Sequence, residues 1–242
     1  LGPALRDVPL AWNAPGVPHP FSTRHHGLIR PALRAASYLS VRDGGSLRLL
    51  GPSAEEAIAV VPDPVAELPA LWSRRDLAAD FRALLRRKGL ADGTRLMAIH
   101  VRNRSIAGED QAALATAFEK LAALRGLLPM VVAVGESHDD PAVARALSRH
   151  FRGPHFVLDD PLSLREVTAA LAHSALYVGA SLHGYVAATA YDVPGVLVAR
   201  PTYHKFVGYL EHVGRLHDLA RDWHQAPSIA GGRRLEESRG NR

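Results

Sequence analysis

Residues 175–198 read ALYVGASLHGYVAATAYDVPGVLV, and this stretch decides the fold. An apolar run, ALYVGAS, is followed by a segment of helical length, LHGYVAATAY, and then by a second apolar run, VPGVLVA. Short apolar runs that alternate with helices are typical of strands buried on both faces of a parallel sheet. The turn Asp192-Val193-Pro194-Gly195 divides the stretch, so neither part reaches the roughly 18 apolar residues of a membrane helix. We therefore predict a strand–helix–strand unit in a soluble chain.

The same alternation continues outward from this unit. Further strands are predicted at residues 95–102, 128–137 and 154–160. Helices are predicted at residues 109–126, 140–151, 163–174, 205–214 and 215–223. Ser163, followed three residues later by Glu166, is a capping-box signature at the start of one of them. The pattern predicts an α/β fold with a Rossmann-like parallel sheet and flanking helices.

The first 90 residues follow a different pattern, with about three short strands among loops rich in Pro and Gly. Three strands are too few for a complete Rossmann-like domain, so the beginning of this domain is expected to be missing. The predicted division is residues 1–74 as the C-terminal part of an N-terminal Rossmann-like domain, 75–92 as a connecting helix, 93–226 as the C-terminal Rossmann-like domain, and 227–242 as a disordered polar tail. Within the first part, Asp43 is interpreted as a helix cap beside Arg42, which leaves acceptor binding by Arg42 as the alternative.

Composition excludes several kinds of chemistry. The chain has no cysteine, which excludes disulfides, thiolate catalysis and cysteine-ligated zinc. The sequence contains no Walker A loop, no G-x-G-x-x-G fingerprint after a strand and no G-x-S-x-G elbow, and its 13 histidines match no metal signature. The formal net charge is +5. That charge suits an anionic partner, and it equally suits a solvated surface rich in arginine.

Candidate site residues follow the predicted strands at their carboxyl ends, where open parallel sheets bind ligands. They are Arg102 and Arg104, then Glu136, Ser137 and His138, and then Ser181 and His183. His183 opens a helix, whose N-terminus attracts phosphate or carboxylate. The pattern supports two interpretations equally: a histidine that caps the helix, or an acid–base group in an anion site. The small residues around it favour the second, because they let a ligand approach the backbone.

Five segments, in this order, resemble the polysaccharide pyruvyl transferase family. They are YLSVRDGGSLRLL (38–50), VVPDPV (60–65), IHVRNR (99–104), LYVGASLHGYVAATAYDVPGVLV (176–198) and HKF (204–206). The resemblance implies a GT-B-like two-domain architecture and a reaction in which phosphoenolpyruvate and two hydroxyls of one sugar give a pyruvate ketal and phosphate. It also implies a bacterial enzyme of exopolysaccharide biosynthesis that works in the cytoplasm, at the inner face of the membrane.

The partners implied by the resemblance are phosphoenolpyruvate as donor substrate and a saccharide acceptor, in lipid-linked form, with peripheral membrane association. No nucleic acid, metal or organic cofactor is expected. By resemblance His183 is the catalytic acid. The substrate-binding residues are Arg102, Arg104, Ser181, Leu182, Gly184 and Lys205. Many members have arginine where this chain has Ser181, which removes one anion ligand that Arg104 or Lys205 can replace.

Two other functions remain open at this stage. A GT-B glycosyltransferase would share the sheet pattern, with Glu136 as the candidate carboxylate for the ribose of a nucleotide sugar. A non-catalytic homologue that binds polysaccharide would explain Ser181 in the position of the family arginine.

Overall fold

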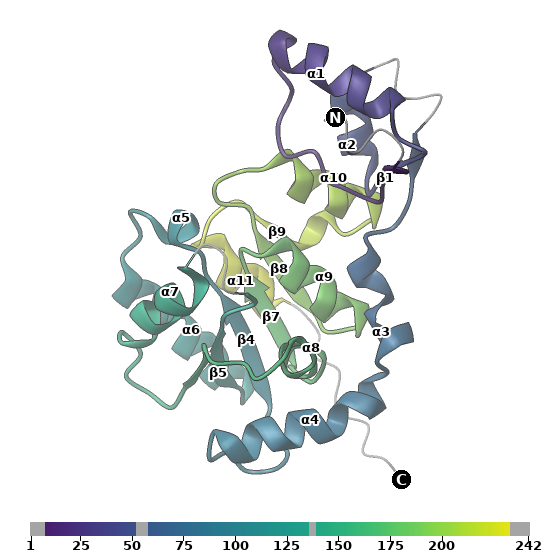
Figure 1. Cartoon of the computed structure of the whole chain (residues 1–242). Helices are drawn as coiled ribbons and strands as arrows, with labels where there is room; N and C mark the ends of the chain where they lie inside the picture. The colour runs from purple at the N-terminus through teal and green to yellow at the C-terminus, as the bar shows by residue number, and fades with distance from the viewer. Residues whose placement is uncertain (1–7, 52–57, 136–138, 233–242) are drawn as a thin grey trace. The chain divides into compact units, whose positions relative to one another are not determined.

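The computed structural model describes residues 8–51, 58–135 and 139–232 (Figure 1). The chain forms two compact units, each of which combines segments that are distant in the sequence. Unit 1 contains Leu1–Pro64 and Tyr203–Leu216, and unit 2 contains Val65–Thr202 and His217–Arg242. The chain therefore passes between the units at residues 64–65, 202–203 and 216–217.

Unit 2 is built on a six-stranded sheet in the order β6-β5-β4-β7-β8-β9, and every neighbouring pair is parallel. The strands are β4 (Leu96–His100), β5 (Leu128–Val132), β6 (Phe156–Leu158), β7 (Leu176–Gly179), β8 (Gly195–Val198) and β9 (Leu219–Ala220). Counted within the unit, this order is 3-2-1-4-5-6, which is the order of a complete Rossmann sheet. The predicted fold class is confirmed, and the topological switch point lies between β4 and β7.

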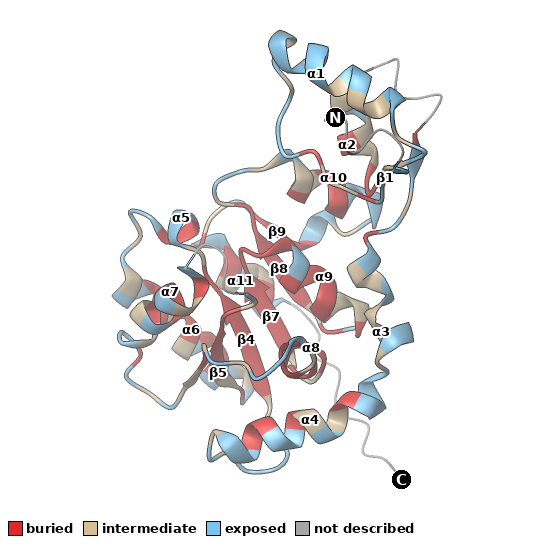
Figure 2. Cartoon of the chain, viewed as in Figure 1, coloured by how far each residue is buried: buried red, intermediate tan, exposed pale blue. Residues whose placement is uncertain are grey.

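Two layers of helices cover this sheet. One layer contains α6 (Gln111–Arg125), α7 (Asp140–Ser148) and α11 (Gln225–Gly231). The other contains α4 (Arg74–Arg87), α8 (Leu164–Ala172) and α9 (Leu182–Ala190). Figure 2 shows the strands almost continuously buried between them. Phe118, Trp223 and Tyr177 are among the largest side chains in this core. The short helices α3 (Leu68–Leu71) and α5 (Asn103–Ile106) complete the unit, and the 3-10 turns Pro64–Glu67 and Leu216–Asp218 fall where the chain passes from unit 1 to unit 2.

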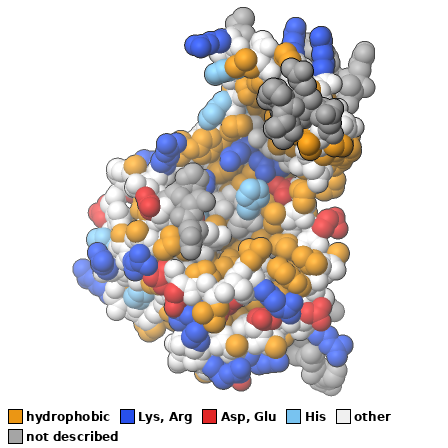
Figure 3. Space-filling model, viewed as in Figure 1, with side chains coloured by type: hydrophobic (Ala, Val, Ile, Leu, Met, Phe, Trp, Pro, Cys, Tyr) orange, Lys and Arg blue, Asp and Glu red, His pale blue; other side chains and the backbone are white. Residues whose placement is uncertain are grey.

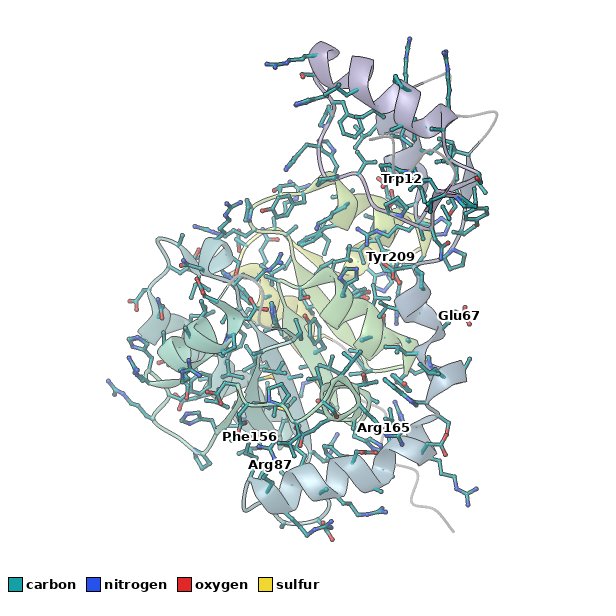
Figure 4. All side chains as sticks on the ribbon, in the orientation of Figure 1. Trp12, Glu67, Arg87, Phe156, Arg165 and Tyr209 are labelled. Atoms are coloured by element: carbon teal, nitrogen blue, oxygen red, sulfur yellow. The ribbon has the colours of Figure 1, made fainter. Side chains whose placement is uncertain are left out.

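The helix starts of unit 2 follow from their capping residues. The Ser163 side chain accepts a hydrogen bond from the N–H of Glu166, as the capping-box signature predicts. The Glu166 carboxylate does not return to Ser163: it accepts instead from the N–H of Leu162 at 2.7 Å and from Arg87 at 2.8 Å. Arg87 on α4 and Arg165 on α8, both labelled in Figure 4, thus belong to ion pairs that join these two helices.

Unit 1 contains a three-stranded parallel sheet in the order β1-β2-β3. Its elements are β1 (Ala11–Trp12), α1 (Thr23–Arg34), β2 (Tyr38–Val41), α2 (Gly44–Leu50), β3 (Ala59–Val60) and α10 (His204–His212). Helices α2 and α10 pack closely because both carry glycine at the contact. A Cβ on Gly45 would lie 3.1 Å from the Cα of Gly208. This packing places α10 in unit 1.

A buried ionic cluster lies beside β2 in unit 1. Arg42 and Asp63 form an ion pair at 2.9 Å, and both side chains are almost fully buried. Asp43, also buried, accepts a hydrogen bond from the N–H of Ser46 and so caps α2. The interpretation of Asp43 as a helix cap is confirmed, and the Arg42 guanidinium is held by carboxylates of the same unit.

The structure differs from the sequence prediction at three places. The predicted helix at 215–223 is instead a 3-10 turn followed by β9, because Leu219 and Ala220 complete the ladder of β8. Residues 227–231, assigned by the sequence to a disordered tail, belong to α11, whose Ala226 and Ala230 are buried in the core. The predicted division placed 203–216 in the C-terminal domain, whereas it belongs to unit 1.

Within the described ranges, no helix combines the length and the apolar composition needed to cross a bilayer. Lys and Arg side chains are spread over the face of the molecule seen in Figure 3, and Asp and Glu lie among them. Several arginines of unit 2 are in surface ion pairs, such as Arg145 with Asp159 at 2.6 Å. The positive charge of this unit is therefore distributed over its surface.

Candidate functional site

The carboxyl ends of β4 and β7 lie side by side at the switch point of the unit 2 sheet. His100, the last residue of β4, lies opposite Gly179, the last residue of β7. The N–H of Ala180 donates to the carbonyl of His100 at 3.0 Å, so the two chains stay paired beyond the strands. From this edge β4 leads to Arg102 and β7 leads to His183. Crevices outside such strand ends are where open α/β sheets bind ligands.

Helix α9 presents its N-terminus at this edge. Ser181 is its N-cap: the side chain accepts from the N–H of Gly184 at 3.2 Å, while the Ser181 carbonyl accepts from the N–H of Tyr185 at 3.0 Å. The first N–H groups of an α-helix have no acceptor within the helix, and the helix dipole makes this end attractive to anions. Of the two interpretations of His183, the capping role belongs to Ser181.

His183 stands out from its neighbours on α9. Its side chain is exposed, whereas Ser181, Leu182, Gly184 and Tyr185 are buried. The helix is thus anchored in the core on both sides of one exposed imidazole. An imidazole on a fixed turn at a helix N-terminus can donate a hydrogen bond to an anion or transfer a proton to a bound substrate.

The glycines near His183 have a packing role that the sequence did not reveal. A Cβ on Gly184 would lie 2.6 Å from the hydroxyl of Tyr177, and a Cβ on Gly179 would lie 2.5 Å from the same atom. The Tyr177 hydroxyl donates to the carbonyl of Ser181 at 3.1 Å. These glycines make room for the fully buried Tyr177, whereas the sequence suggested that they give a ligand access to the backbone. The N–H of Gly184 already donates to the Ser181 side chain, so ligand binding by Leu182 and Gly184 stays a prediction.

Arg102 and Arg104 follow β4 on a short turn. Arg102 is partly exposed and Arg104 is exposed. Ser105 holds the turn: its hydroxyl accepts from the N–H of Arg102 at 3.0 Å and donates to the Arg102 carbonyl at 2.8 Å. The indole N–H of Trp223 donates to the Ser105 carbonyl at 2.7 Å, which ties the turn to the core. Arg102 is therefore fixed at its backbone next to the switch point.

Lys205 belongs to unit 1, on the first turn of α10, whereas the other predicted site residues belong to unit 2. Its ammonium group lies 5.5 Å from the centroid of the Tyr203 ring and 5.9 Å from that of Phe206. Such distances are typical of cation–π contacts. Its binding role stays a prediction, and the candidate residues Glu136, Ser137 and His138 lie outside the described residues.

The sequence did not reveal one polar pair at this edge, His100 and Asp140. The ring Nε2–H of His100 donates to Oδ2 of Asp140 at 2.9 Å, and both side chains are buried. Asp140 lies at the start of α7, beside β5, which neighbours β4. The only signal in the sequence was a histidine at the end of an otherwise apolar strand. Its partner is 40 residues away, at a spacing that no short motif covers.

Tyr177 lies within the electrostatic influence of both sides of this site. Burial raises its pKa far above the ordinary value for tyrosine. The negative charge of Asp140 raises the Tyr177 pKa further, while the positive charge of Arg102 lowers it. Tyr177 is thus a neutral hydrogen-bond donor under ordinary conditions. Across the described residues, no group of three or more His, Asp or Glu side chains could hold a metal ion.

Comparisons with known proteins give the family and the fold of this chain. A family model described as "Polysaccharide pyruvyl transferase" matches residues 2–201. The solved structure of Methanocaldococcus jannaschii UDP-GlcNAc 2-epimerase, in complex with UDP-GlcNAc and UDP, is similar with a TM-score of 0.56 at 12% identity, over 83% of this chain and 56% of that one. This similarity shows the GT-B-like fold alone.

A second solved structure matches less closely. It is an α,α-trehalose-phosphate synthase (UDP-forming) from Burkholderia vietnamiensis, with a TM-score of 0.44 at 15% identity, over 93% of this chain and 60% of that one. The present chain thus spans less than two thirds of the length of either structure. No curated protein matches the chain in sequence.

Proposed function

The chain belongs to the polysaccharide pyruvyl transferase family, and from this premise we propose that it transfers the enolpyruvyl group of phosphoenolpyruvate to a sugar as a pyruvate ketal. The observation that carries the proposal is the arrangement at the switch point of unit 2. The exposed His183 opens the nine-residue helix α9, and Arg102 follows the adjacent strand. This arrangement suits a small substrate with two anionic groups and a carbon that must be protonated.

The proposed reaction assigns a task to each group. His183 gives a proton to C3 of phosphoenolpyruvate, which makes C2 electrophilic, and the first sugar hydroxyl adds to C2 with loss of its proton. The second hydroxyl then forms its bond to C2 as the bond from C2 to the phosphate oxygen breaks. Phosphate leaves, and the two hydroxyl protons balance the proton taken up by C3 and the proton on the released phosphate.

Arg102 and the α9 N-terminus would hold the phosphate and the carboxylate of the donor. Arginine matches both anions with its planar fork of N–H donors, and the helix end adds N–H groups and its dipole. Arg104 would add further positive charge. The scheme uses no metal and no organic cofactor. We expect the acceptor to be a lipid-linked precursor of a bacterial exopolysaccharide, modified at the cytoplasmic face of the membrane.

Phosphate release tests the proposal. The full chain is incubated with phosphoenolpyruvate and a panel of lipid-linked and nucleotide-linked sugars. We expect release that depends on both substrates and that falls by about 10²–10⁴-fold in His183→Asn, the range typical of a lost general acid. His150→Gln is the matched control, because His150 is also an exposed histidine of unit 2 but lies beyond the end of α7. Its rate should equal that of the wild type.

A binding measurement separates the alternatives. Phosphoenolpyruvate should stabilise the protein against heat, by about 2.7 kcal/mol at a concentration of 100 times the Kd. Arg102→Met should lose most of this stabilisation, whereas Arg82→Met, an exposed arginine of α4, should keep it. Stabilisation by nucleotide sugars without any effect of phosphoenolpyruvate would favour a glycosyltransferase. Donor binding unchanged in His183→Asn, with no turnover by either protein, would favour a non-catalytic homologue.

A further inference from the structure

The burial of the pair His100 and Asp140 lowers the stability of the folded chain. The exposed fraction is 0% for His100 and 4% for Asp140. Apart from their mutual hydrogen bond at 2.9 Å, the second ring nitrogen of His100 and the second carboxylate oxygen of Asp140 have no hydrogen-bond partner in the described part of the chain. A buried polar atom without a partner costs about 1–3 kcal/mol. A well-packed apolar pair would often serve stability as well or better, so stability does not account for this pair.

His100 of this pair lies next to Gly179, at the start of the turn that leads to His183. His100 is opposite Gly179 in the β4–β7 ladder, and a Cβ on Gly179 would lie 2.9 Å from the Cβ of His100. The His100 carbonyl accepts the hydrogen bond of Ala180, the next residue of the turn. His100 is therefore coupled to the Gly179–Ala180 segment by strand pairing and by this hydrogen bond, and there is no room at Gly179 for a larger residue.

Tyr177 joins the pair to the helix cap. Its side chain occupies the space that a Cβ on Gly179 or Gly184 would need, and its hydroxyl donates to the Ser181 carbonyl at 3.1 Å. The chain of contacts runs from Asp140 on α7 to His100 at the end of β4, then through Gly179 and Tyr177 to Ser181 at the start of α9. On the other side, His100 is two residues from Arg102.

We propose that His100 and Asp140 are positioning residues that fix Arg102 and His183 relative to each other at the switch point. In this proposal Asp140 sets the orientation of the His100 ring. The ring in turn fixes the carboxyl ends of β4 and β7. The kinetic part of this proposal rests on the proposed pyruvyl transfer. A small change in the placement of reacting groups, near 1 Å, can cost about 10²-fold in rate.

Kinetics of conservative variants test the proposal. Asp140→Asn keeps the shape of the side chain and removes its charge, and His100→Gln keeps a polar group but loses the ring. We expect both to lower kcat by about 10–100-fold and to change KM for phosphoenolpyruvate by less than about threefold, since misplacement acts mainly on the chemical step. His155→Gln is the matched control. Like His100, His155 forms a hydrogen bond with a residue of α7, in this case Ser148 at 2.8 Å. It lies just before β6, however, and not at the carboxyl end of β4 or β7.

A structural readout makes the test independent of turnover. The ring signals of His183 are observed by NMR with ¹³C-labelled histidine and assigned with His183→Asn. Asp140→Asn and His100→Gln should shift these signals, and so should Tyr177→Phe, which loses the hydrogen bond to Ser181. His155→Gln should leave them in place even where it lowers the melting temperature by the same amount.

Each outcome decides the proposal. His183 signals that are unchanged in Asp140→Asn and Tyr177→Phe would overturn it, as would a loss of kcat that matches only the loss of folded protein. If His100→Gln does not fold, the other two variants still decide. A wild-type protein that never turns over phosphoenolpyruvate would refute the proposed function, and the NMR shifts would then judge the positioning role alone.

Discussion

His100 and Gly179 face each other across the β4–β7 ladder with no space between them for another side chain. Gly179→Ala should therefore destabilise unit 2 by about 1–3 kcal/mol, as overpacking of a core does. The new Cβ would lie 2.5 Å from the hydroxyl of Tyr177, 2.8 Å from its Cζ and 2.9 Å from the Cβ of His100. Tyr177→Phe removes only the hydroxyl and leaves the other two atoms in place, so the double variant should regain only part of the lost stability. Urea unfolding measures each difference, and full recovery in the double variant would contradict the packing described.

The cost of Gly184→Ala, unlike that of Gly179→Ala, should depend strongly on whether Tyr177 is replaced by Phe. Its Cβ would lie 2.6 Å from the Tyr177 hydroxyl but 3.2 Å from the nearest ring carbons. Removal of the hydroxyl in Tyr177→Phe therefore relieves the main clash. We expect Gly184→Ala to cost about 1–3 kcal/mol in the wild-type background and clearly less in the Tyr177→Phe background, with a coupling energy of about 1 kcal/mol. Equal costs in the two backgrounds would count against the contact.

The buried ion pair of unit 1 should be far more sensitive than an exposed pair of the same unit. Asp63→Asn removes the carboxylate that pairs with the buried Arg42 guanidinium at 2.9 Å and leaves it only the more distant Asp43, at 3.7 Å, so it should cost about 3–5 kcal/mol. Glu211→Gln is the matched control, because Glu211 pairs with Arg48 at 3.3 Å at the surface. Its cost should be about 0–1 kcal/mol. Urea unfolding of both variants checks the ranking, and similar costs would show that Arg42 and Asp63 contribute no more than a surface pair.

His173 should make unit 2 less stable in mild acid. Burial lowers the pKa of His173, and the positive charges of Arg74 and Arg82 act in the same direction against a hydrogen bond to the Arg74 carbonyl. The unfolded chain, with a histidine pKa near 6.5, then binds more protons than the folded chain in the window below this value. The free energy of unfolding therefore has its full value above about pH 6.5. It falls as the pH decreases from there toward the lowered pKa of His173 in the folded chain.

Urea midpoints at several pH values between about 5 and 7.5 measure this dependence. His173→Gln should flatten the curve below about pH 6.5, whereas His150→Gln, at an exposed site, should retain it. A wild-type curve that is flat over this range would contradict the prediction.

The parallel sheet could be predicted from sequence because its strands are continuous apolar runs with helices between them. The same pattern placed His183 at a helix start and Arg102 after a strand, and both follow strands that the structure brings to the switch point. Those predictions depended only on local periodicity and on the rule that ligands bind at carboxyl strand ends.

Other features depended on contacts between distant residues. Asp140 is 40 residues from His100, and Tyr177 explains two glycines that looked like openings for a ligand. Leu219 and Ala220 have a helical pattern in the sequence, but the edge of β8 offers them hydrogen bonds in a strand. The membership of Lys205 in unit 1 was hidden for the same reason, because only the packing of α10 on α2 assigns that segment.

The chain passes between the two units at three points, and this affects how it folds during synthesis. Helix α10 is needed to cover α2, yet it is encoded about 150 residues after it, beyond five of the six strands of the other sheet. During translation α2 therefore lacks its packing partner α10, and unit 1 stays incomplete, until residue 216 has left the ribosome. By that time five strands of unit 2 have been made and only β9 and α11 remain, so both units are completed near the end of synthesis.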